Sequence, residues 1–292
     1  MELYHKEIFS MSEEAFRHHM TGIVKETVDR LMLKDFEDDP LLPGKYSKIS
    51  SIVGSAYKRH GFVLEQAILF RLKQNEKFIV WDDQKFGVTA SAESLVSTFI
   101  DRESDALDSD LPYLVEAKDQ VRTIQVDCIV YDKTERSLVT YEIKRGNGLH
   151  DSGKRRSMKR DLLIQQTLLK SYGTKRGLDV KKVDSKVIFY YGQCSLPPPF
   201  SLTSKELDLE FGFELQRYVE IANSMLATSL EMEIEKLINP SNQQSNVGST
   251  FIASSDSEST PNEVKYLEHS NIETPNETSL STKGLFSRFF KS

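Results

Sequence analysis

Two runs in the middle of the chain alternate apolar and polar residues as half-buried β-strands do. They are "TIQVDCIVYD" (residues 123–132) and "SLVTYEIK" (137–144), and only "KTER" separates them. Because so short a connection keeps the strands side by side, the pattern predicts an antiparallel hairpin. A third run, "KVIFYYGQ" (186–193), is apolar on both faces, which is typical of a strand in the interior of a sheet. A fourth strand is expected at "KFIVWDD" (77–83).

Segments on either side of these strands carry apolar residues at helical spacing. They cover residues 1–44, 45–75, 154–173 and 213–238. The second segment could be one helix or two helices broken near Gly61, and Gly173 is expected to stop the third. The sequence therefore predicts an α/β protein with a mixed central β-sheet flanked by helices.

Three regions follow from the breaks in this pattern. Prolines and a glycine in "KDFEDDPLLPG" separate an N-terminal helical arm (1–44) from an α/β domain (45–238). Residues 239–292 are rich in polar residues and predict a disordered tail, because few apolar groups are present to offset the cost of ordering. The tail ends in the basic and aromatic "KGLFSRFFKS", which is either a protein-partner or membrane-surface peptide or a transiently ordered terminus.

The composition of the chain says more about the cellular compartment of the protein than about its function. A chain of 292 residues with 38% hydrophobic content can form a substantial core. The two cysteines lack CxxC spacing, so neither a disulfide framework nor a zinc site is indicated. Neither a signal peptide nor an apolar run of about 20 residues is visible, which predicts a cytoplasmic protein without a membrane span. A homodimer is compatible with all of this.

Positive charge is concentrated in one stretch of an acidic protein. The net charge is −6, yet residues 144–186 contain 13 Lys and Arg against four Asp, a local charge of +9 that leaves −15 elsewhere. The cations at the start of the predicted helix are Lys154, Arg155, Arg156, Lys159 and Arg160. Since cations oppose the dipole at a helix N-terminus, we expect an anionic partner there, such as a nucleic-acid backbone, rather than only solvent.

Three ionisable residues can converge on the hairpin. Strict alternation puts Ile124, Val126, Cys128 and Val130 on one face of the first strand and Asp127 on the other, while Glu142 and Lys144 share a face of the second. Two close, half-buried carboxylates repel each other, so a cation usually accompanies them. Oxygen ligands suit Mg²⁺ or Mn²⁺, and a nearby lysine can orient or deprotonate a water. An ordinary solvated strand face is the alternative interpretation.

The stretch "QVDCIVYDKTERSLVTYEIKRG" resembles the core motif of the PD-(D/E)xK nuclease superfamily, which has a restriction-endonuclease-like fold. Asp127, fourteen intervening residues and then Glu142-Ile143-Lys144 match that motif position by position, although Val126 replaces its proline. The resemblance covers roughly residues 50–195. It implies that Asp127 and Glu142 bind Mg²⁺ or Mn²⁺, that Ile143 lends a backbone carbonyl and that Lys144 assists the water.

The same resemblance points to two positions outside the hairpin. Glu65, in "GFVLEQAI", corresponds to the acid that the family's preceding helix often contributes to the metal. A glutamine on the helix after the Glu-x-Lys strand corresponds to Gln165 or Gln166, and Gln165 is favoured by its helical face. The chain is therefore expected to be a metal-dependent nuclease that hydrolyses phosphodiester bonds, with DNA as substrate. A catalytically silent nucleic-acid-binding or scaffolding module of the same fold is the alternative.

Overall fold

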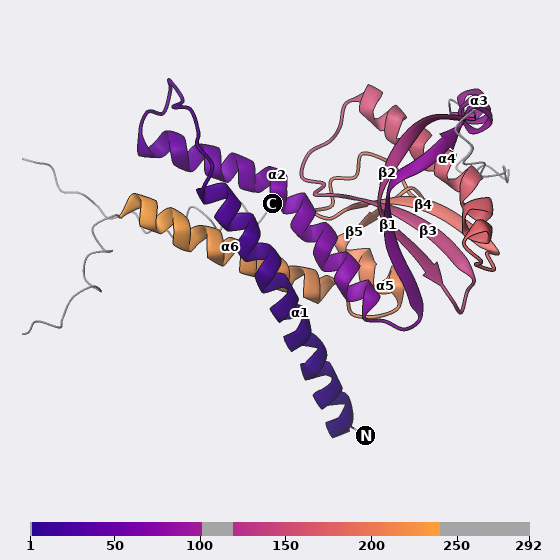
Figure 1. Ribbon diagram of the computed structural model, residues 1–292, viewed down its shortest axis with the longest axis horizontal. Coiled ribbons are helices and arrows are strands. Elements are labelled where there is room, and N and C mark those ends of the chain that lie inside the picture. Colours follow the sequence, from indigo (N-terminus) through magenta and orange to yellow (C-terminus); the bar gives the residue numbers. More distant parts are fainter. Residues whose placement is uncertain (1, 101–118, 240–292) are drawn as a thin grey trace, which may run out of the picture. The chain divides into compact units, whose positions relative to one another are not determined.

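The computed structural model describes residues 2–100 and 119–239 of the chain (Figure 1). In chain order, the elements are α1 (Glu2–Met32), α2 (Lys45–Lys73), β1 (Phe78–Thr89), α3 (Ala90–Phe99), β2 (Gln120–Asp132), β3 (Ser137–Lys144), α4 (Ser152–Lys175), β4 (Lys182–Phe189), β5 (Ser201–Thr203), the 3-10 turn Ser204–Glu206, α5 (Leu207–Phe211) and α6 (Gln216–Ile238). The predicted tail from residue 240 onwards lies outside the described residues.

The strands form one five-stranded mixed sheet in the order β1-β2-β3-β4-β5. β2 is antiparallel to both β1 and β3, whereas β4 is parallel to β3 and β5 is parallel to β4. The predicted β2–β3 hairpin is confirmed, and β4 lies between two other strands as its apolar pattern indicated. The helix α4 makes the crossover that a parallel β3–β4 pair requires.

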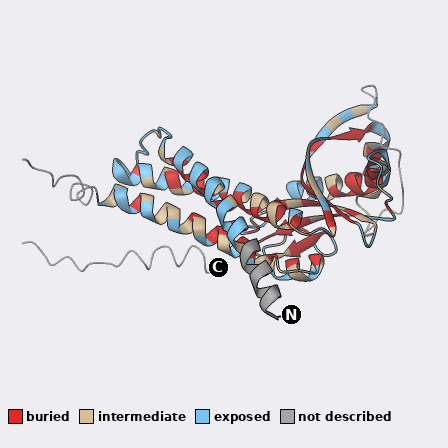
Figure 2. Ribbon diagram, turned by 60° about the horizontal axis from the view of Figure 1, so that its bottom comes forward, coloured by how far each residue is buried: buried red, intermediate tan, exposed pale blue. Residues whose placement is uncertain are grey.

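Helices cover both faces of the sheet, and each face has its own core (Figures 1 and 2). On one face, α1, α2 and α6 pack against Cys128, Val130, Tyr141 and Ile188. On the other face, α3 and α4 pack against Ile129, Tyr131, Leu138 and Val187. The mixed sheet flanked by helices is therefore as predicted.

The first helix packs into the main core. Phe16 of α1 is fully buried, and its ring meets Tyr218 of α6 edge-on at 5.1 Å and Phe70 of α2 at 6.0 Å. Met20 and Val24 belong to the same cluster. Residues 16–28 of the predicted arm thus share a core with the helices on this face of the sheet.

Gly61 and Gly173, where the sequence suggested a helix break and a helix stop, both lie within helices. Helix α2 continues through Gly61 without a break. The prediction that Gly173 stops α4 is wrong, because the helix continues to Lys175. A Cβ atom at Gly173 would lie 2.5 Å from Val180 Cγ2 and 2.8 Å from Leu138 Cδ2. The glycine therefore allows close packing of the helix on the sheet.

Candidate active site

The candidate site lies where β2 and β3 separate. Their pairing runs from Asp132 opposite Ser137 to Cys128 opposite Tyr141. Asp127 and Glu142 come next in this register, but from there β2 continues along β1 while β3 continues along β4. Beyond the last pair, Asp127 Oδ2 accepts a hydrogen bond of 2.8 Å from the backbone N–H of Ile143. The Asp127 carboxylate thus accepts the hydrogen bond of Ile143 N–H at a position where β2 no longer offers a backbone carbonyl.

A bulge in β2 lies at the same place. Trp81 of β1 is opposite Ile129 and Asp83 is opposite Val126, so Asp82 alone faces two residues, Asp127 and Cys128. An extra residue of this kind interrupts the alternation of side chains and redirects the strand. Such bulges are common beside active sites.

The bulge corrects the predicted faces of this strand. Ile124 and Val126 pack in the core that contains Ile129 and Tyr131, whereas Cys128 and Val130 pack in the opposite core. The prediction that Ile124, Val126, Cys128 and Val130 share one face is therefore wrong. Strict alternation fails because Asp127 and Cys128 together occupy the place of one residue.

Lys144 lies within reach of both hairpin acids. Its Nζ is 2.7 Å from Glu142 Oε1 and 4.0 Å from Asp127 Oδ2. Burial lowers the pKa of Lys144, but the attraction of Glu142 and Asp127 outweighs burial and leaves that pKa raised. Lys144 is consequently a cation and hydrogen-bond donor at neutral pH, suited to orienting a water or phosphate oxygen rather than removing a proton.

Glu65 shares the electrostatic environment of the hairpin acids. Burial, followed by repulsion from Asp127 and Asp82, raises the pKa of Glu65 from 4.5 to about 7. Burial also raises the pKa of Asp127, although the hydrogen bond from Ile143 and the charge of Lys144 oppose this. Asp82 was not among the predicted residues, because a single acid near the end of a predicted strand carries no signal of its own.

The hydrogen bonds of the neighbouring peptide groups indicate the direction of the Ile143 carbonyl. Successive peptide groups of a strand point alternately toward its two neighbours. Lys144 O accepts a 3.0 Å hydrogen bond from Tyr190 N just after β4, whereas Ile143 N points to Asp127. The carbonyl of Ile143 therefore points toward the gap between β2 and β3, where Asp127 lies.

The two candidate glutamines on α4 have different surroundings. Both are buried, and Gln166 donates a 2.9 Å hydrogen bond to Asp184 Oδ1 near the start of β4. Gln165 lies one turn beyond Asp161, whose pKa is raised mainly by burial and partly by the charge of Glu142. Gln166 is thus engaged with the sheet at Asp184, whereas the choice of Gln165 over Gln166 stays a prediction.

The basic segment divides into two parts. Lys154, Arg155 and Arg156 lie exposed in the first turn of α4, after an Asp151 cap whose side chain accepts a hydrogen bond from Lys154 N. Arg160 is partly buried and forms an ion pair with Glu93 of α3.

Lys159 is also partly buried, and its Nζ lies 5.6 Å from the centre of the Phe200 ring. The first turn is therefore better placed than Lys159 and Arg160 to contact a phosphate backbone.

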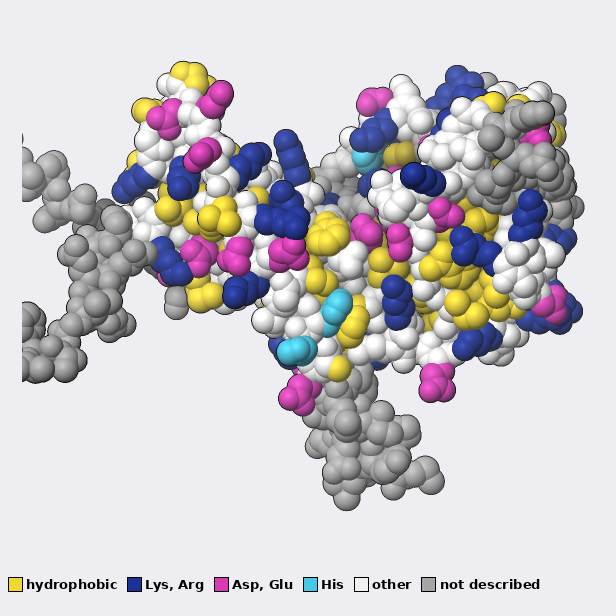
Figure 3. Space-filling view, viewed as in Figure 1, with side chains coloured by type: hydrophobic (Ala, Val, Ile, Leu, Met, Phe, Trp, Pro, Cys, Tyr) yellow, Lys and Arg dark blue, Asp and Glu magenta, His cyan; other side chains and the backbone are white. Residues whose placement is uncertain are grey.

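Asp127, Glu142 and Glu65 offer the oxygen ligands that a divalent cation prefers, although no three of the described acids lie close enough together to hold one. All three supply carboxylate oxygens, and the pKa of Glu65 is raised mainly by burial and further by repulsion from Asp127 and Asp82, with Lys144 opposing this. Asp and Glu side chains gather where α2 approaches the sheet, with Lys and Arg around them (Figure 3). Within residues 2–100 and 119–239, no three His, Cys, Asp or Glu side chains are close enough together to hold a metal ion. Binding of an ion by these acids would therefore require them to move closer together.

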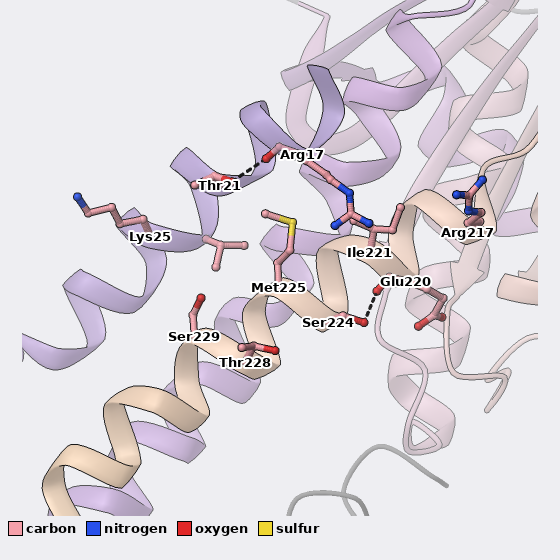
Figure 4. A pocket seen from close by; sticks show the side chains of 11 residues that line it. Arg17, Thr21, Lys25, Arg217, Glu220, Ile221, Ser224, Met225, Thr228 and Ser229 are labelled. Carbon is pink, nitrogen blue, oxygen red and sulfur yellow. Dashed lines mark hydrogen bonds between the residues drawn. The ribbon is translucent and has the colours of Figure 1, made fainter. Parts of the chain in front are cut away.

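A hollow lies elsewhere, between α1 and α6 (Figure 4). It has a volume of about 620 Å³, and none of the predicted site residues line it. Two of its cations, Arg17 and Arg217, pair with Glu13 of α1 at 2.9 and 2.6 Å. The Arg17–Glu13 pair lies within α1, whereas the Arg217–Glu13 pair joins α6 to α1.

Comparisons with protein-family models, with curated proteins and with solved structures found no match for this chain. None of the helices in the described ranges is both long and apolar enough to cross a membrane.

Proposed function

We propose that the protein is a metal-dependent nuclease of the PD-(D/E)xK type that hydrolyses phosphodiester bonds in DNA. The observation that carries the proposal is the meeting of Asp127, Glu142 and Lys144 where β2 and β3 separate, with Asp127 fixed by the N–H of Ile143. A β-bulge interrupts the hydrogen bonding between strands and redirects a side chain, and such bulges are common next to active sites.

Each residue has a separate task in this proposal. Asp127, Glu142, Glu65 and the carbonyl of Ile143 would hold Mg²⁺ or Mn²⁺, which when bound lowers the pKa of a water and offsets charge on a phosphate oxygen. Lys144, kept as a cation by its acidic neighbours, would orient the attacking water and hydrogen-bond to the phosphate.

Gln165, buried in the middle of α4, would act by positioning neighbouring groups of the site. The exposed cations of the first turn of α4 would hold the phosphate backbone.

The test is cleavage of plasmid, linear and single-stranded DNA by purified protein with Mg²⁺ or Mn²⁺. We expect cleavage that EDTA abolishes and that falls at least about 100-fold in Asp127→Ala and Lys144→Ala. Glu135→Ala, in the β2–β3 turn at the other end of the hairpin, is the matched control and should cleave normally. Cleavage that survives in Asp127→Ala and Lys144→Ala would exclude the proposed site.

A catalytically silent nucleic-acid-binding module is the second candidate. It is favoured by the Glu142–Lys144 ion pair of 2.7 Å and by the open spacing of the acids in the described residues. Calorimetric titration with Mg²⁺ separates the two candidates. A nuclease should bind the ion in the wild type and lose that binding in Asp127→Ala, whereas a silent module should release no heat in either protein.

A further inference from the structure

An arginine stacked between two tyrosines lies beside the candidate site. Arg145 directly follows Lys144, so their Cα atoms are about 3.8 Å apart. Its guanidinium lies 3.5 Å from the centre of the Tyr57 ring on α2 and 5.6 Å from that of Tyr191, just after β4. Arg145 Nη1 also donates a 3.0 Å hydrogen bond to the backbone carbonyl of Tyr57. We call Tyr57, Arg145 and Tyr191 the stacking cluster.

The stacking cluster contains polar groups that its neighbours leave unsatisfied. Arg145 Nε and Tyr191 Oη are buried and have no hydrogen-bond partner within residues 2–100 and 119–239. No carboxylate of these residues forms an ion pair with Arg145, in contrast to Arg122, which pairs with Glu93 and Asp161. An arginine that is half-buried, stacked and without a carboxylate suits an anionic or aromatic ligand.

The surroundings hold the cluster in place while one ring stays accessible. Asn147, in the loop after β3, donates a hydrogen bond to Tyr57 Oη. Behind the cluster, His60 is buried, 5.8 Å from the Tyr191 ring, and its Nε2 is 2.8 Å from Asn223 Oδ1. Tyr57 is nevertheless 49% exposed. An aromatic ring that is held by its neighbours and is also open to solvent can stack on a flat ligand with little loss of conformational entropy.

Its position relates the cluster to the proposed reaction. Tyr57 lies eight residues before Glu65 on α2, about 12 Å along the helix axis. Arg145 continues the strand that carries Glu142 and Lys144. A ligand on Tyr57 would therefore lie beside the two elements, α2 and β3, that carry the proposed site residues Glu65, Glu142 and Lys144.

We propose that the stacking cluster binds an unpaired nucleotide of a DNA strand, with the base on Tyr57 and a phosphate on Arg145, so that the substrate is single-stranded or frayed DNA. This inference rests on the proposed function for its ligand class. In a closed duplex the bases are stacked on each other and offer no face to Tyr57, whereas every unpaired base can stack on an aromatic ring.

The experiment measures binding rather than cleavage. Full-length protein in EDTA is titrated into a labelled single-stranded oligonucleotide and into a blunt duplex of the same sequence. We expect tighter binding to the single strand, and Tyr57→Ala should weaken that binding roughly 5- to 150-fold while leaving duplex binding unchanged. Tyr57→Phe keeps the ring and should bind nearly as the wild type does.

Phe62→Ala is the matched control, because Phe62 is 50% exposed on the same helix and points about 140° away from Tyr57. It should bind as the wild type does. A 2-aminopurine base in the single strand should lose fluorescence on binding to the wild type but not to Tyr57→Ala. Equal binding by wild type and Tyr57→Ala would overturn the inference, as would an equal loss on both DNAs.

The two proposals fail in different ways. Because EDTA removes the metal, the Tyr57 effect does not depend on hydrolysis. A protein that cleaves DNA while Tyr57→Ala binds normally would retain the proposed function and lose this inference. A protein that cleaves nothing while Tyr57→Ala loses single-strand binding would do the reverse.

Discussion

Asp127 shows what a single residue contributes to both fold and site. It is 8% exposed, between Val126 and Cys128, and its carboxylate accepts a hydrogen bond from the backbone N–H of Ile143. The same carboxylate raises the pKa of Glu65 and helps to keep Lys144 charged. One buried acid therefore completes the strand end and adds to the pKa shifts that burial causes at Glu65 and that Glu142 causes at Lys144.

The pKa of Glu65 predicts a pH-dependent stability. Because its folded pKa of about 7 lies above its ordinary 4.5, the folded state binds more protons between these values and becomes less stable as pH rises through them. Glu65→Gln removes this cost, so the variant should match the wild type near pH 4 and exceed it at pH 8. With solvent screening, we expect a gain of about 1 kcal/mol in the free energy of unfolding.

Urea denaturation at the two pH values measures this difference. Mg²⁺ at pH 8 should stabilise the wild type more than Glu65→Gln, since the ion would neutralise the crowded acids. An identical pH dependence in the two proteins would show that burial and the neighbouring acids do not raise the pKa of Glu65.

At the scale of elements, α4 joins the site to the sheet. Its first turn carries the exposed cations, its middle carries Gln165, and its end packs closely on β3 through Gly173. The amphipathic pattern predicts the helix, but whether a glycine ends it or lets it approach a strand depends on what lies opposite.

The close approach at Gly173 can be tested by substitution. Gly173→Ala would place a Cβ against Val180 and Leu138, so we expect the free energy of unfolding to fall by about 1–3 kcal/mol. Gly61→Ala is the control, because nothing lies within 4 Å of a Cβ there. It should stabilise α2 by about 0.5–1 kcal/mol. Urea denaturation measures both, and a neutral Gly173→Ala would contradict the packing role.

The first turn of α4 predicts salt-dependent binding. Replacing Lys154 and Arg155 by alanine should weaken binding to DNA and reduce the slope of log K against log salt by about one for each phosphate that the protein no longer neutralises. Lys181 and Lys182, exposed beyond the other end of α4, provide the control pair and should leave the slope unchanged. Titrations of each protein with DNA at several salt concentrations measure these slopes. Equal slopes for both pairs would remove this turn from the DNA-binding surface.

At the scale of the molecule, the segment expected to form an N-terminal arm contributes to the main core. Phe16 is fully buried against Phe70 and Tyr218, while Leu33, just after the helix, is 83% exposed. The helix therefore supports α2, which carries both Glu65 and Tyr57.

Phe16→Ala tests that support. We expect it to lower the free energy of unfolding by about 3–5 kcal/mol, as for other buried aromatic truncations, whereas Leu33→Ala should change it by less than about 0.5 kcal/mol. Chemical denaturation followed by circular dichroism measures both. Similar stabilities for the two variants would mean that α1 unfolds independently of the sheet.

The sequence by itself determined the β2–β3 hairpin, the interior position of β4 and the flanking helices, because these follow from local periodicity and short connections. It also singled out Asp127, Glu142 and Lys144, since acids in apolar strands are conspicuous. Only the tertiary structure decided the rest. The bulge opposite Asp82, the role of Gly173 and the stacking of Arg145 on Tyr57 depend on which residues from distant segments meet, and that pairing is not encoded in any local pattern.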